Sequence, residues 1–306
     1  MAALQIITII ITTTMGNYCP SIEYKRNDKM IELPEARTIA KDLEKEILGK
    51  TIRDVSGNYT GHKFTFYYKD PNEYKNQLIG KKIAKINERN YYVEFEIEDY
   101  KLIMRDGVNI RYYDNKQTIP EKSKLLLSFD DSSFINITVA MYGFIGVVKN
   151  DENMNDKYYD MEIKGIGVLD QEYTFEYFKS LINDTTKKLS AKAFLVTGQR
   201  ILGIGNGVVQ DILFNAKIHP KKKIQNMSDA EIEALYNSSK NTIITMIEQG
   251  GRDTEKNIYG EYGKYKTILS SKTYKNSKCP NCGNAFKKEN YLGGSIYYCE
   301  ECQLNI

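Results

Sequence analysis

Residues 192–223, KAFLVTGQRILGIGNGVVQDILFNAKIHPKKK, decide how the second half of the chain folds. Apolar residues recur at helical spacing on both sides of a glycine-rich turn, which predicts two helices joined by a tight connection. The apolar positions are Phe194, Leu195, Ile201 and Leu202 before the turn, and Val208, Val209, Ile212, Leu213 and Phe214 after it.

The turn itself, Gly203-Ile204-Gly205-Asn206-Gly207, has the features of an anion-binding site. Its glycines let the backbone come close to a partner because no Cβ stands in the way. Asn206 is placed to cap the following helix, and the free N–H groups at that helix start favour an anion, most commonly a phosphate. The flanking lysines are Lys192, Lys217, Lys221, Lys222 and Lys223. On spacing alone, the alternative is a plain helical hairpin with a solvated basic tail.

Length and composition indicate a globular protein of about two domains. The 306 residues include 43 Lys and Arg against 40 Asp and Glu, giving a net charge of +3, so a nucleic-acid surface requires local clustering of cations. Four of the five cysteines lie between residues 279 and 306. This placement argues against a disulfide framework and favours a metal site in a reducing, cytoplasmic setting.

Residues 1–29 differ from the rest of the chain and are expected to be disordered or untranslated, with Met30 as the start; a targeting segment is the alternative. A helix is predicted directly after Leu33. Pro34 stands at a first helical position, Glu35 suits the positive helix end, and Gly49 closes the helix. Its apolar stripe is Ile39, Leu43 and Ile47.

Residues 30–150 predict a β-sandwich, because β-branched and aromatic runs alternate with turn signals such as Asp106-Gly107 and Asp130-Asp131-Ser132. The expected strands are 51–58, 63–68, 82–87, 91–98, 101–104, 110–113, 125–129, 134–141 and 144–149. Residues 151–171 are a candidate linker, and residues 172–275 are mainly helical, with a capping box at Ser228–Glu231. The fold class is therefore α+β.

The last segment, residues 276–306, contains a four-thiolate motif. Its cysteines are Cys279, Cys282, Cys299 and Cys302, and the intervening Tyr291–Tyr298 predicts a β-hairpin. Two CxxC pairs at this separation suit one structural zinc ion, whose binding would supply most of the folding energy of so small a unit. A redox role is the alternative, but the thioredoxin-like context that it needs is missing.

Three features occur in a fixed order: IELPEARTIAKDLEKEILGKTI, LGIGNGVVQDILFNAKIHP and CPNCG…YYCEECQ. Together they resemble the formamidopyrimidine-DNA glycosylase and endonuclease VIII family of base-excision repair enzymes, over about Met30 to Gln303. The resemblance implies a monomer in which a β-sandwich meets a helix–two-turn–helix domain with a zinc hairpin. Duplex DNA with a damaged base or abasic site lies across the cleft, and the target nucleotide is flipped out. An N-terminal proline amine is then the nucleophile of a glycosylase with abasic-site lyase activity.

The resemblance assigns roles to several residues. Glu32 matches the catalytic carboxylate, and Glu35 the second acid of the ELPE motif. Lys192 matches a lysine that contacts the phosphate of the lesion, while Gly205 and Asn206 lie in the phosphate-binding turn. The four cysteines match the zinc ligands. Without the resemblance, Glu32 is an acid that favours a helix N-terminus, and Lys192 is a solvated lysine.

Other positions depart from the family pattern. Ile31 occupies the position of the family's nucleophilic proline, and its α-amine could act only if it were N-terminal. The amine of Met30 is the other candidate. Asn90 occupies the position of a family lysine that usually precedes a Tyr. Gly294 occupies the position of the arginine of the zinc hairpin. The arginine pair that fills the duplex falls near Gly143 and Phe144.

Tyr142 and Phe144 are predicted either to wedge into the duplex or to join the sandwich core. The departures also leave a second hypothesis open, in which the protein is a non-catalytic module that binds abasic or distorted DNA.

Overall fold

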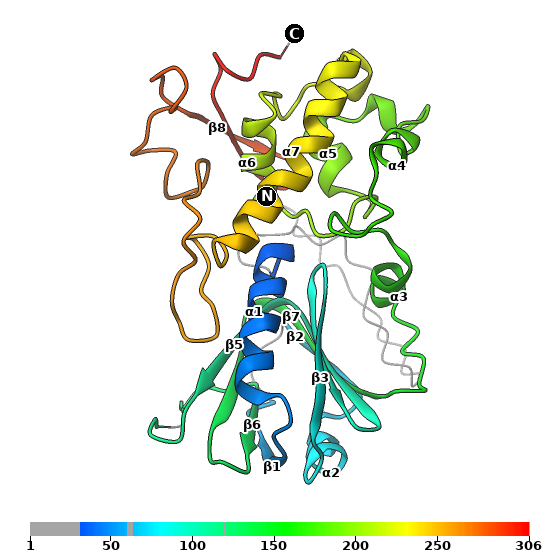
Figure 1. Ribbon diagram of the computed structural model, residues 1–306, viewed down its shortest axis with the longest axis vertical. Coiled ribbons are helices and arrows are strands. Elements are labelled where there is room, and N and C mark those ends of the chain that lie inside the picture. The colour runs from blue at the N-terminus through cyan, green and yellow to red at the C-terminus, as the bar shows by residue number, and fades with distance from the viewer. Residues whose placement is uncertain (1–30, 60–63, 119, 306) are drawn as a thin grey trace, which may run out of the picture.

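The computed structural model describes residues 31–59, 64–118 and 120–305, so the predicted extension 1–29 lies outside the described part (Figure 1). A β-rich region lies at one end of the molecule, and a helical region with a small hairpin lies at the other. Helix α1, Leu33–Ile47, packs on the β-rich region and points at the helical one. Within the described residues, no helix combines the length and apolar character that crossing a membrane requires.

Helix α1 confirms the predicted amphipathic stripe. Ile39, Leu43 and Ile47 are buried in the core of the β-rich region. The helix ends at Leu48, and Gly49 follows with φ of 79°, a left-handed conformation that glycine adopts without strain. Glu32 occupies the N-cap position, but its side chain makes no capping bond to α1 and is directed elsewhere.

Seven strands form the β-rich region, in the order β1-β6-β7-β5-β4-β3, with β2 beside β7. They are β1 Ile52–Ser56, β2 Thr65–Tyr68, β3 Ile83–Arg89, β4 Tyr92–Ile97, β5 Tyr100–Tyr113, β6 Leu125–Phe129 and β7 Phe134–Lys149. A short helix, α2 Tyr74–Leu78, was not predicted because five residues carry too little periodicity.

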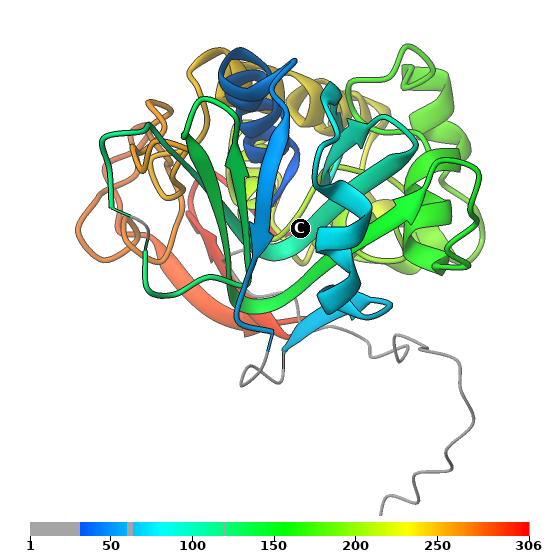
Figure 2. The same ribbon diagram turned by 90° about the horizontal axis from the view of Figure 1, so that it is seen from below.

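The predicted break at Asp106-Gly107 is wrong, because β5 runs through it. The register against β7 shifts between Asp106 and Val108, and Asp106 has φ of 62°, so the turn signal is used in a β-bulge. Before the bulge β5 pairs with β4 and β7; after it β5 pairs with β7, which there also pairs with β6. The two long strands thereby pass from one layer of the sandwich to the other (Figure 2). The separate strands 134–141 and 144–149 are likewise one strand.

The helical region contains α3 Lys157–Lys164, α4 Phe175–Ser180, α5 Ala191–Val196, α6 Val208–Asn215 and α7 Asp229–Glu248. Helix α3 lies within the predicted linker 151–171. The capping box that opens α7 is confirmed, with Ser228 and Glu231 bonded reciprocally. Helices α4, α5, α6 and α7 share one apolar core, which also takes in Leu33 from the start of α1.

The predicted hairpin near the C-terminus is confirmed as β8 Lys287–Tyr291 and β9 Gly294–Tyr298. It docks on α6 through Gln210, whose Oε1 accepts the N–H of Tyr297 at 3.1 Å and whose Nε2 donates to the carbonyl of Ser295 at 3.2 Å. Residues 252–286 connect α7 to this hairpin without a helix or strand.

Candidate active site and metal centre

The glycine turn between α5 and α6 wraps around the residues that precede and begin α1. Helix α5 ends at Val196, so Ile201 and Leu202 belong to the turn rather than to the helix that the sequence predicted. A Cβ at Gly203 would lie 2.7 Å from Leu33, and one at Gly205 would lie 2.4 Å from Oε1 of Glu32. The partner that the glycines allow to approach is therefore the protein's own chain, and Gly205 packs against Glu32.

The N-terminus of α6 holds an anion, as predicted, but the anion is the carboxylate of Glu32. Its Oε1 accepts the N–H of Gly207 and its Oε2 accepts the N–H of Val208, both at 2.8 Å. Gly207 is the N-cap residue, so the prediction that Asn206 caps this helix is wrong. In the described structure, Glu32 occupies the position that the sequence assigned to a phosphate.

Arg252 completes the site, and its role was not predicted from the sequence. Its Nε and Nη2 donate to the two carboxylate oxygens of Glu35 at 2.8 Å each, and its Nη1 lies 3.7 Å from Oε2 of Glu32. All three side chains are buried. A lone arginine after the glycine pair that ends α7 has no pattern from which to infer this role.

Burial sets the electrostatics of this cluster. It raises the pKa of Glu32 above its ordinary value, and Arg252 and the two backbone donors only partly oppose that rise. Although burial alone would lower it, the pKa of Arg252 is held above its ordinary value by Glu35 and Glu32. Glu32 is therefore a carboxyl group that holds a proton more readily than an ordinary glutamate does.

A cavity of about 600 Å³ lies beside the cluster and is lined by Ile31, Glu35, Arg252, Glu255 and Tyr262, among others. The backbone N–H of Ile31 donates to the carbonyl of Asp106 at 3.1 Å. Burial raises the pKa of Glu255 to about 7, with Glu35 and Glu32 adding to the rise and Arg252 opposing it. The structure thus brings Ile31 and Glu35 to one cavity.

Lys192 and Asn206 meet at the turn of the β8–β9 hairpin. Lys192 is fully buried, and its Nζ donates to the carbonyls of Tyr291 and Ser295 at 3.3 and 3.4 Å. A Cβ at Gly294 would lie 3.7 Å from Nδ2 of Asn206, so the position of the family arginine adjoins the turn. These bonds tie helix α5 to the turn of the hairpin.

Of the two places predicted for Phe144, the structure shows a buried one, in an apolar cluster that joins the sandwich to Leu202 and Met154. It is 5% exposed, and the guanidinium of Arg105 lies 4.7 Å from its ring centre. Tyr142 is half-buried, with its ring 4.6 Å from that of Phe64. Asn90 is buried at the domain junction, where its Nδ2 donates to Glu162 of α3 at 3.0 Å.

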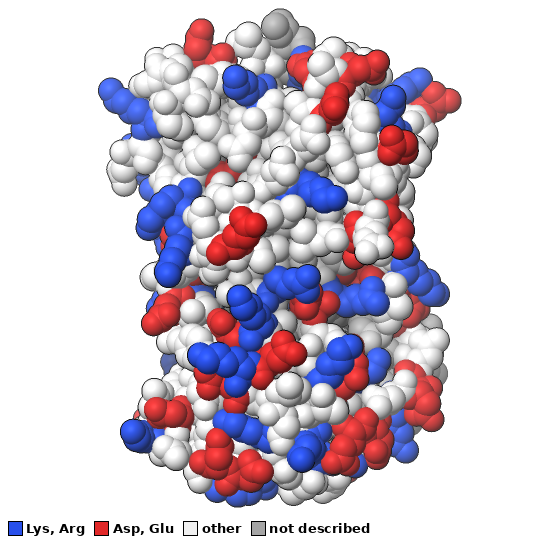
Figure 3. Space-filling model, in the orientation of Figure 1, with Lys and Arg blue, Asp and Glu red and all other residues white. Residues whose placement is uncertain are grey.

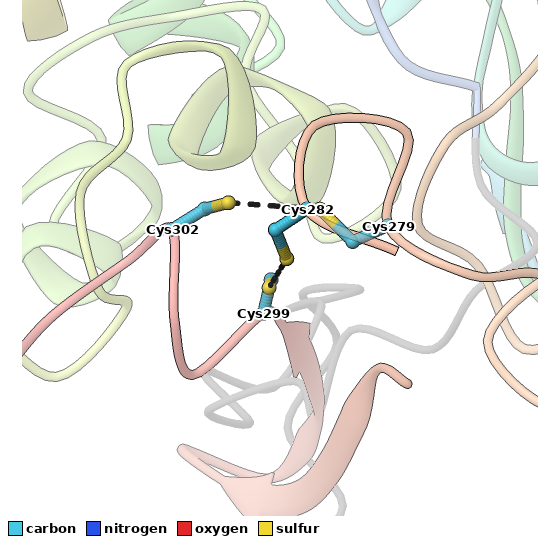
Figure 4. A group of neighbouring side chains, drawn as sticks. All are labelled: Cys279, Cys282, Cys299 and Cys302. Atoms are coloured by element: carbon cyan, nitrogen blue, oxygen red, sulfur yellow. Dashed lines mark hydrogen bonds between the residues drawn. The ribbon is translucent and has the colours of Figure 1, made fainter. Parts of the chain in front are cut away.

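The four cysteines converge at the base of the hairpin (Figure 4). Their sulfur atoms all lie within 4.8 Å of one another, with 3.7 Å between Cys279 and Cys302 and 3.4 Å between Cys282 and Cys299. Sulfurs bound to one tetrahedral zinc at 2.3 Å would be about 3.8 Å apart. This donor set therefore fits a metal ion.

Comparison with known proteins agrees with this architecture. The family model described as the formamidopyrimidine-DNA glycosylase N-terminal domain matches residues 30–139, and the model described as the H2TH domain of the same enzymes matches residues 165–257. Formamidopyrimidine-DNA glycosylase from Bacillus cereus is 27% identical over 284 residues, which cover 90% of this chain and all of that protein. The enzyme of the same name from Lactococcus lactis subsp. lactis is 29% identical over 280 residues, covering 90% of this chain and 99% of its own.

Solved structures show the same arrangement. The Lactococcus lactis Fpg bound to DNA with an abasic site superimposes with a TM-score of 0.76 at 25% identity, covering 89% of this chain and 99% of that one. Its complex with Fapy-dG-containing DNA gives 0.75 at 26%, covering 89% and 100%. Two matching domains in the same order and a shared overall fold lead to one assignment. The chain belongs to the formamidopyrimidine-DNA glycosylase family.

Proposed function

We propose that the protein is a DNA glycosylase of base-excision repair with abasic-site lyase activity, acting on duplex DNA that carries a damaged base or an abasic site. The observation that carries this proposal is Glu32, a buried carboxyl group held by two backbone N–H groups beside a cavity large enough for a flipped nucleotide. Binding the DNA backbone alone would not require a buried acid in this place.

In this reaction an amine attacks the sugar carbon C1′, and the base leaves with the electron pair of the glycosidic bond and a proton. The attached nitrogen gives up a proton, the C1′–O4′ bond opens with O4′ taking a proton, and the nitrogen lone pair forms a protonated imine with C1′. Loss of a proton from C2′ then expels the 3′ phosphate and breaks the strand. Glu32 is the group that we assign to these proton transfers, and Glu35 lies next to it on the cavity. A chain beginning at Ile31 would present its amine at the atom that now donates to Asp106. The amine of Met30 is the other candidate.

We assign Lys192, Gly205 and Asn206 to the side of the site that faces the DNA backbone, because they surround Glu32 and the hairpin turn. Tyr142 is the remaining candidate for a contact within the duplex gap. Zinc is the metal that we assign to the four cysteines, and it is structural because four thiolates leave no open coordination position. Thiolates of such a site need a reducing compartment, which supports a cytoplasmic protein, nucleoid-associated if prokaryotic.

Borohydride trapping on duplex DNA with one abasic site tests the proposal. The chain begun at Met30 and the full chain are compared, each with its Glu32→Gln variant. We expect a covalent adduct from the short form, located by peptide mapping at Met30 or Ile31, and at least about a hundredfold slower strand cleavage by Glu32→Gln. Adducts from both forms would identify an internal lysine as the nucleophile. Tight binding to the same duplex without any adduct or cleavage would instead establish a non-catalytic binding module.

A further inference from the structure

Arg252 lies where three parts of the chain meet: the start of α1, the start of α6, and the segment that leaves α7. It is 3% exposed, and its planar group binds Glu35 with two parallel hydrogen bonds of 2.8 Å each. This two-point contact fixes the orientation of the guanidinium, because rotation would break one of the bonds. The third nitrogen is thereby directed at Glu32, at 3.7 Å.

The guanidinium packs directly against the backbone at the start of α6. A Cβ at Gly207 would lie 1.8 Å from Nη1 of Arg252, so the guanidinium fills the space that a side chain would take at the start of α6. The main chain of Arg252 is fixed too, since the N–H of Gly263 donates to its carbonyl at 3.1 Å. Only glycine at position 207 permits this arrangement.

The charges around Glu32 make a nearby cation necessary. Two buried carboxyl groups at close range cannot both ionise without one, because burial and mutual repulsion each favour the protonated form. Glu35 from α1 and Glu255 from the segment after α7 are the acids that face this cluster, and Asp211 of α6 also interacts with Arg252. The favourable contacts of Glu32 are Arg252 and the N–H groups of α6.

We propose that Arg252 is a positioning residue that seats the Glu32 carboxylate on the start of α6 and keeps it able to ionise, with Glu35 fixing the guanidinium in place. The inference rests on the proposed function in giving Glu32 the proton-transfer role. It assigns to Glu35 a second task, which is to orient the cation rather than to touch the substrate.

The first test follows Glu32 directly and needs no activity. Carbon NMR of the glutamate carboxyl groups, with Glu32→Gln to assign the signal, gives the titration midpoint in the full chain. We expect the midpoint to rise by about one unit or more in Arg252→Met and by less in Arg252→Lys, which keeps the charge but loses the two-point contact. Arg105→Met is the matched control, because Arg105 is equally buried and binds Asp156 at 2.9 Å. An unchanged midpoint in Arg252→Met would overturn the inference.

The second test uses the form of the chain that cleaves abasic DNA. The acidic limb of the pH profile of kcat should move to higher pH in Arg252→Met, so that the tenfold or larger loss expected at pH 6 shrinks at pH 9. Arg105→Met should keep the wild-type limb. Combining Arg252→Met with Glu35→Gln removes the cation and also the repulsion between Glu35 and Glu32. The acidic limb of the kcat profile should then return toward its wild-type pH. An equal loss of kcat at all pH values would show that Arg252 has only a structural role. If the wild-type chain cleaves nothing, the proposed function fails while the NMR titration still decides the inference.

Discussion

At the scale of single residues, the site depends on side chains that are absent as much as on those present. Gly205 matters because nothing projects from it toward Glu32, and Gly294 because nothing projects from it toward the position where a backbone phosphate is expected. The two glycines are therefore expected to respond in opposite ways to substitution.

Gly205→Ala should disable the site. The new methyl group would lie 2.4 Å from Oε1 of Glu32, so either the carboxylate leaves the N–H groups of α6 or the turn moves. We expect a loss of roughly 1–3 kcal/mol in the free energy of unfolding, the usual result of overpacking, and a loss of abasic-site cleavage that exceeds it. Urea unfolding and a cleavage assay check this. Gly294→Ala is the control, since its methyl would make only ordinary contacts of 3.7 Å or more. Equal behaviour of the two variants would contradict the role given to Glu32.

Gly294→Arg should strengthen DNA binding. The position adjoins Asn206, has room for a side chain and does not require a positive φ, so an arginine is accommodated without strain. One added phosphate contact should steepen the dependence of log K on log salt concentration by about 0.9. Fluorescence anisotropy at several salt concentrations measures the slope, and Gly294→Gln separates charge from size. An unchanged slope would mean that the hairpin turn does not face the DNA backbone.

At the scale of elements, the sequence predicted most of what local patterns can encode. The stripe of α1, the capping box of α7, the hairpin and the four cysteines were all visible because their signals lie within a few turns of chain. Two strand breaks were misplaced, since Asp106-Gly107 suits a bulge as well as a turn. The bond between Glu32 and Gly207 joins residues 175 positions apart, and Arg252 reaches Glu35 across 217 positions, so no local pattern announced either.

The β8–β9 hairpin is an element whose docking should require the metal that we assign to the four cysteines. Its hydrophobic contacts with α6 are few. The side chains of Gln210 and Lys192 hold it through hydrogen bonds to its backbone carbonyls. Removing the metal with a chelator should expose β8 and β9 to hydrogen exchange while β7 stays protected, and should weaken DNA binding at least about tenfold. Restoring zinc should reverse both effects. Unchanged protection of β9 after verified metal removal would contradict this prediction.

Asp211 ties α6 to the segment after α7, and its effect should depend on pH. Its oxygens accept the N–H groups of Ile268 and Leu269 at 3.0 and 2.8 Å, and burial raises its pKa from 3.8 to about 6. The folded protein therefore binds this proton more tightly than the unfolded chain does. The stability that results is fully present below about pH 4 and is lost as the pH rises through 6.

Asp211→Asn removes this titration. The difference in the free energy of unfolding between wild type and Asp211→Asn should fall by roughly 3 kcal/mol from pH 4 to pH 7. Urea unfolding at the two pH values gives the difference, in which the other carboxyl groups cancel. A difference that stays constant or grows with pH would show that Asp211 titrates normally.

At the scale of the whole molecule, the junction between the two regions is the feature that departs furthest from a simple two-domain description. Leu33 joins the helical core, Ile258 joins the sandwich core, and α3 lies within the segment predicted as a linker. On the face shown in Figure 3, cations and anions are interspersed, in keeping with the small net charge. That face shows no broad basic surface, and we expect recognition of DNA to depend on the junction and the hairpin.

The junction should reject the family lysine at position 90. Asn90 has φ of 48°, which asparagine tolerates better than lysine, and a Cβ at Gly167 would lie 2.2 Å from its Oδ1. We expect Asn90→Lys to lower the melting temperature and to give no gain in cleavage, in contrast to the gain in binding from Gly294→Arg. Calorimetry and the cleavage assay test both parts. Asn90→Asp, similar in shape, separates the effect of size from that of charge. Faster cleavage by Asn90→Lys would show that the junction has room for the missing cation.

The seating of Glu32 has a consequence for how this protein can be divided. Its carboxyl group is encoded with the β-sandwich, but the backbone donors and the arginine that surround it are encoded in the second half of the chain. In a β-sandwich expressed alone, Glu32 would be an ordinary surface acid. In the second half alone, the backbone donors at the start of α6 would lack their carboxylate. Neither half alone is expected to cleave DNA. Mixing two separately produced fragments should therefore restore cleavage only to the extent that they reassociate. The environment of Glu32 thus forms only when the two halves are joined, and the titration of its carboxyl group should show whether they are.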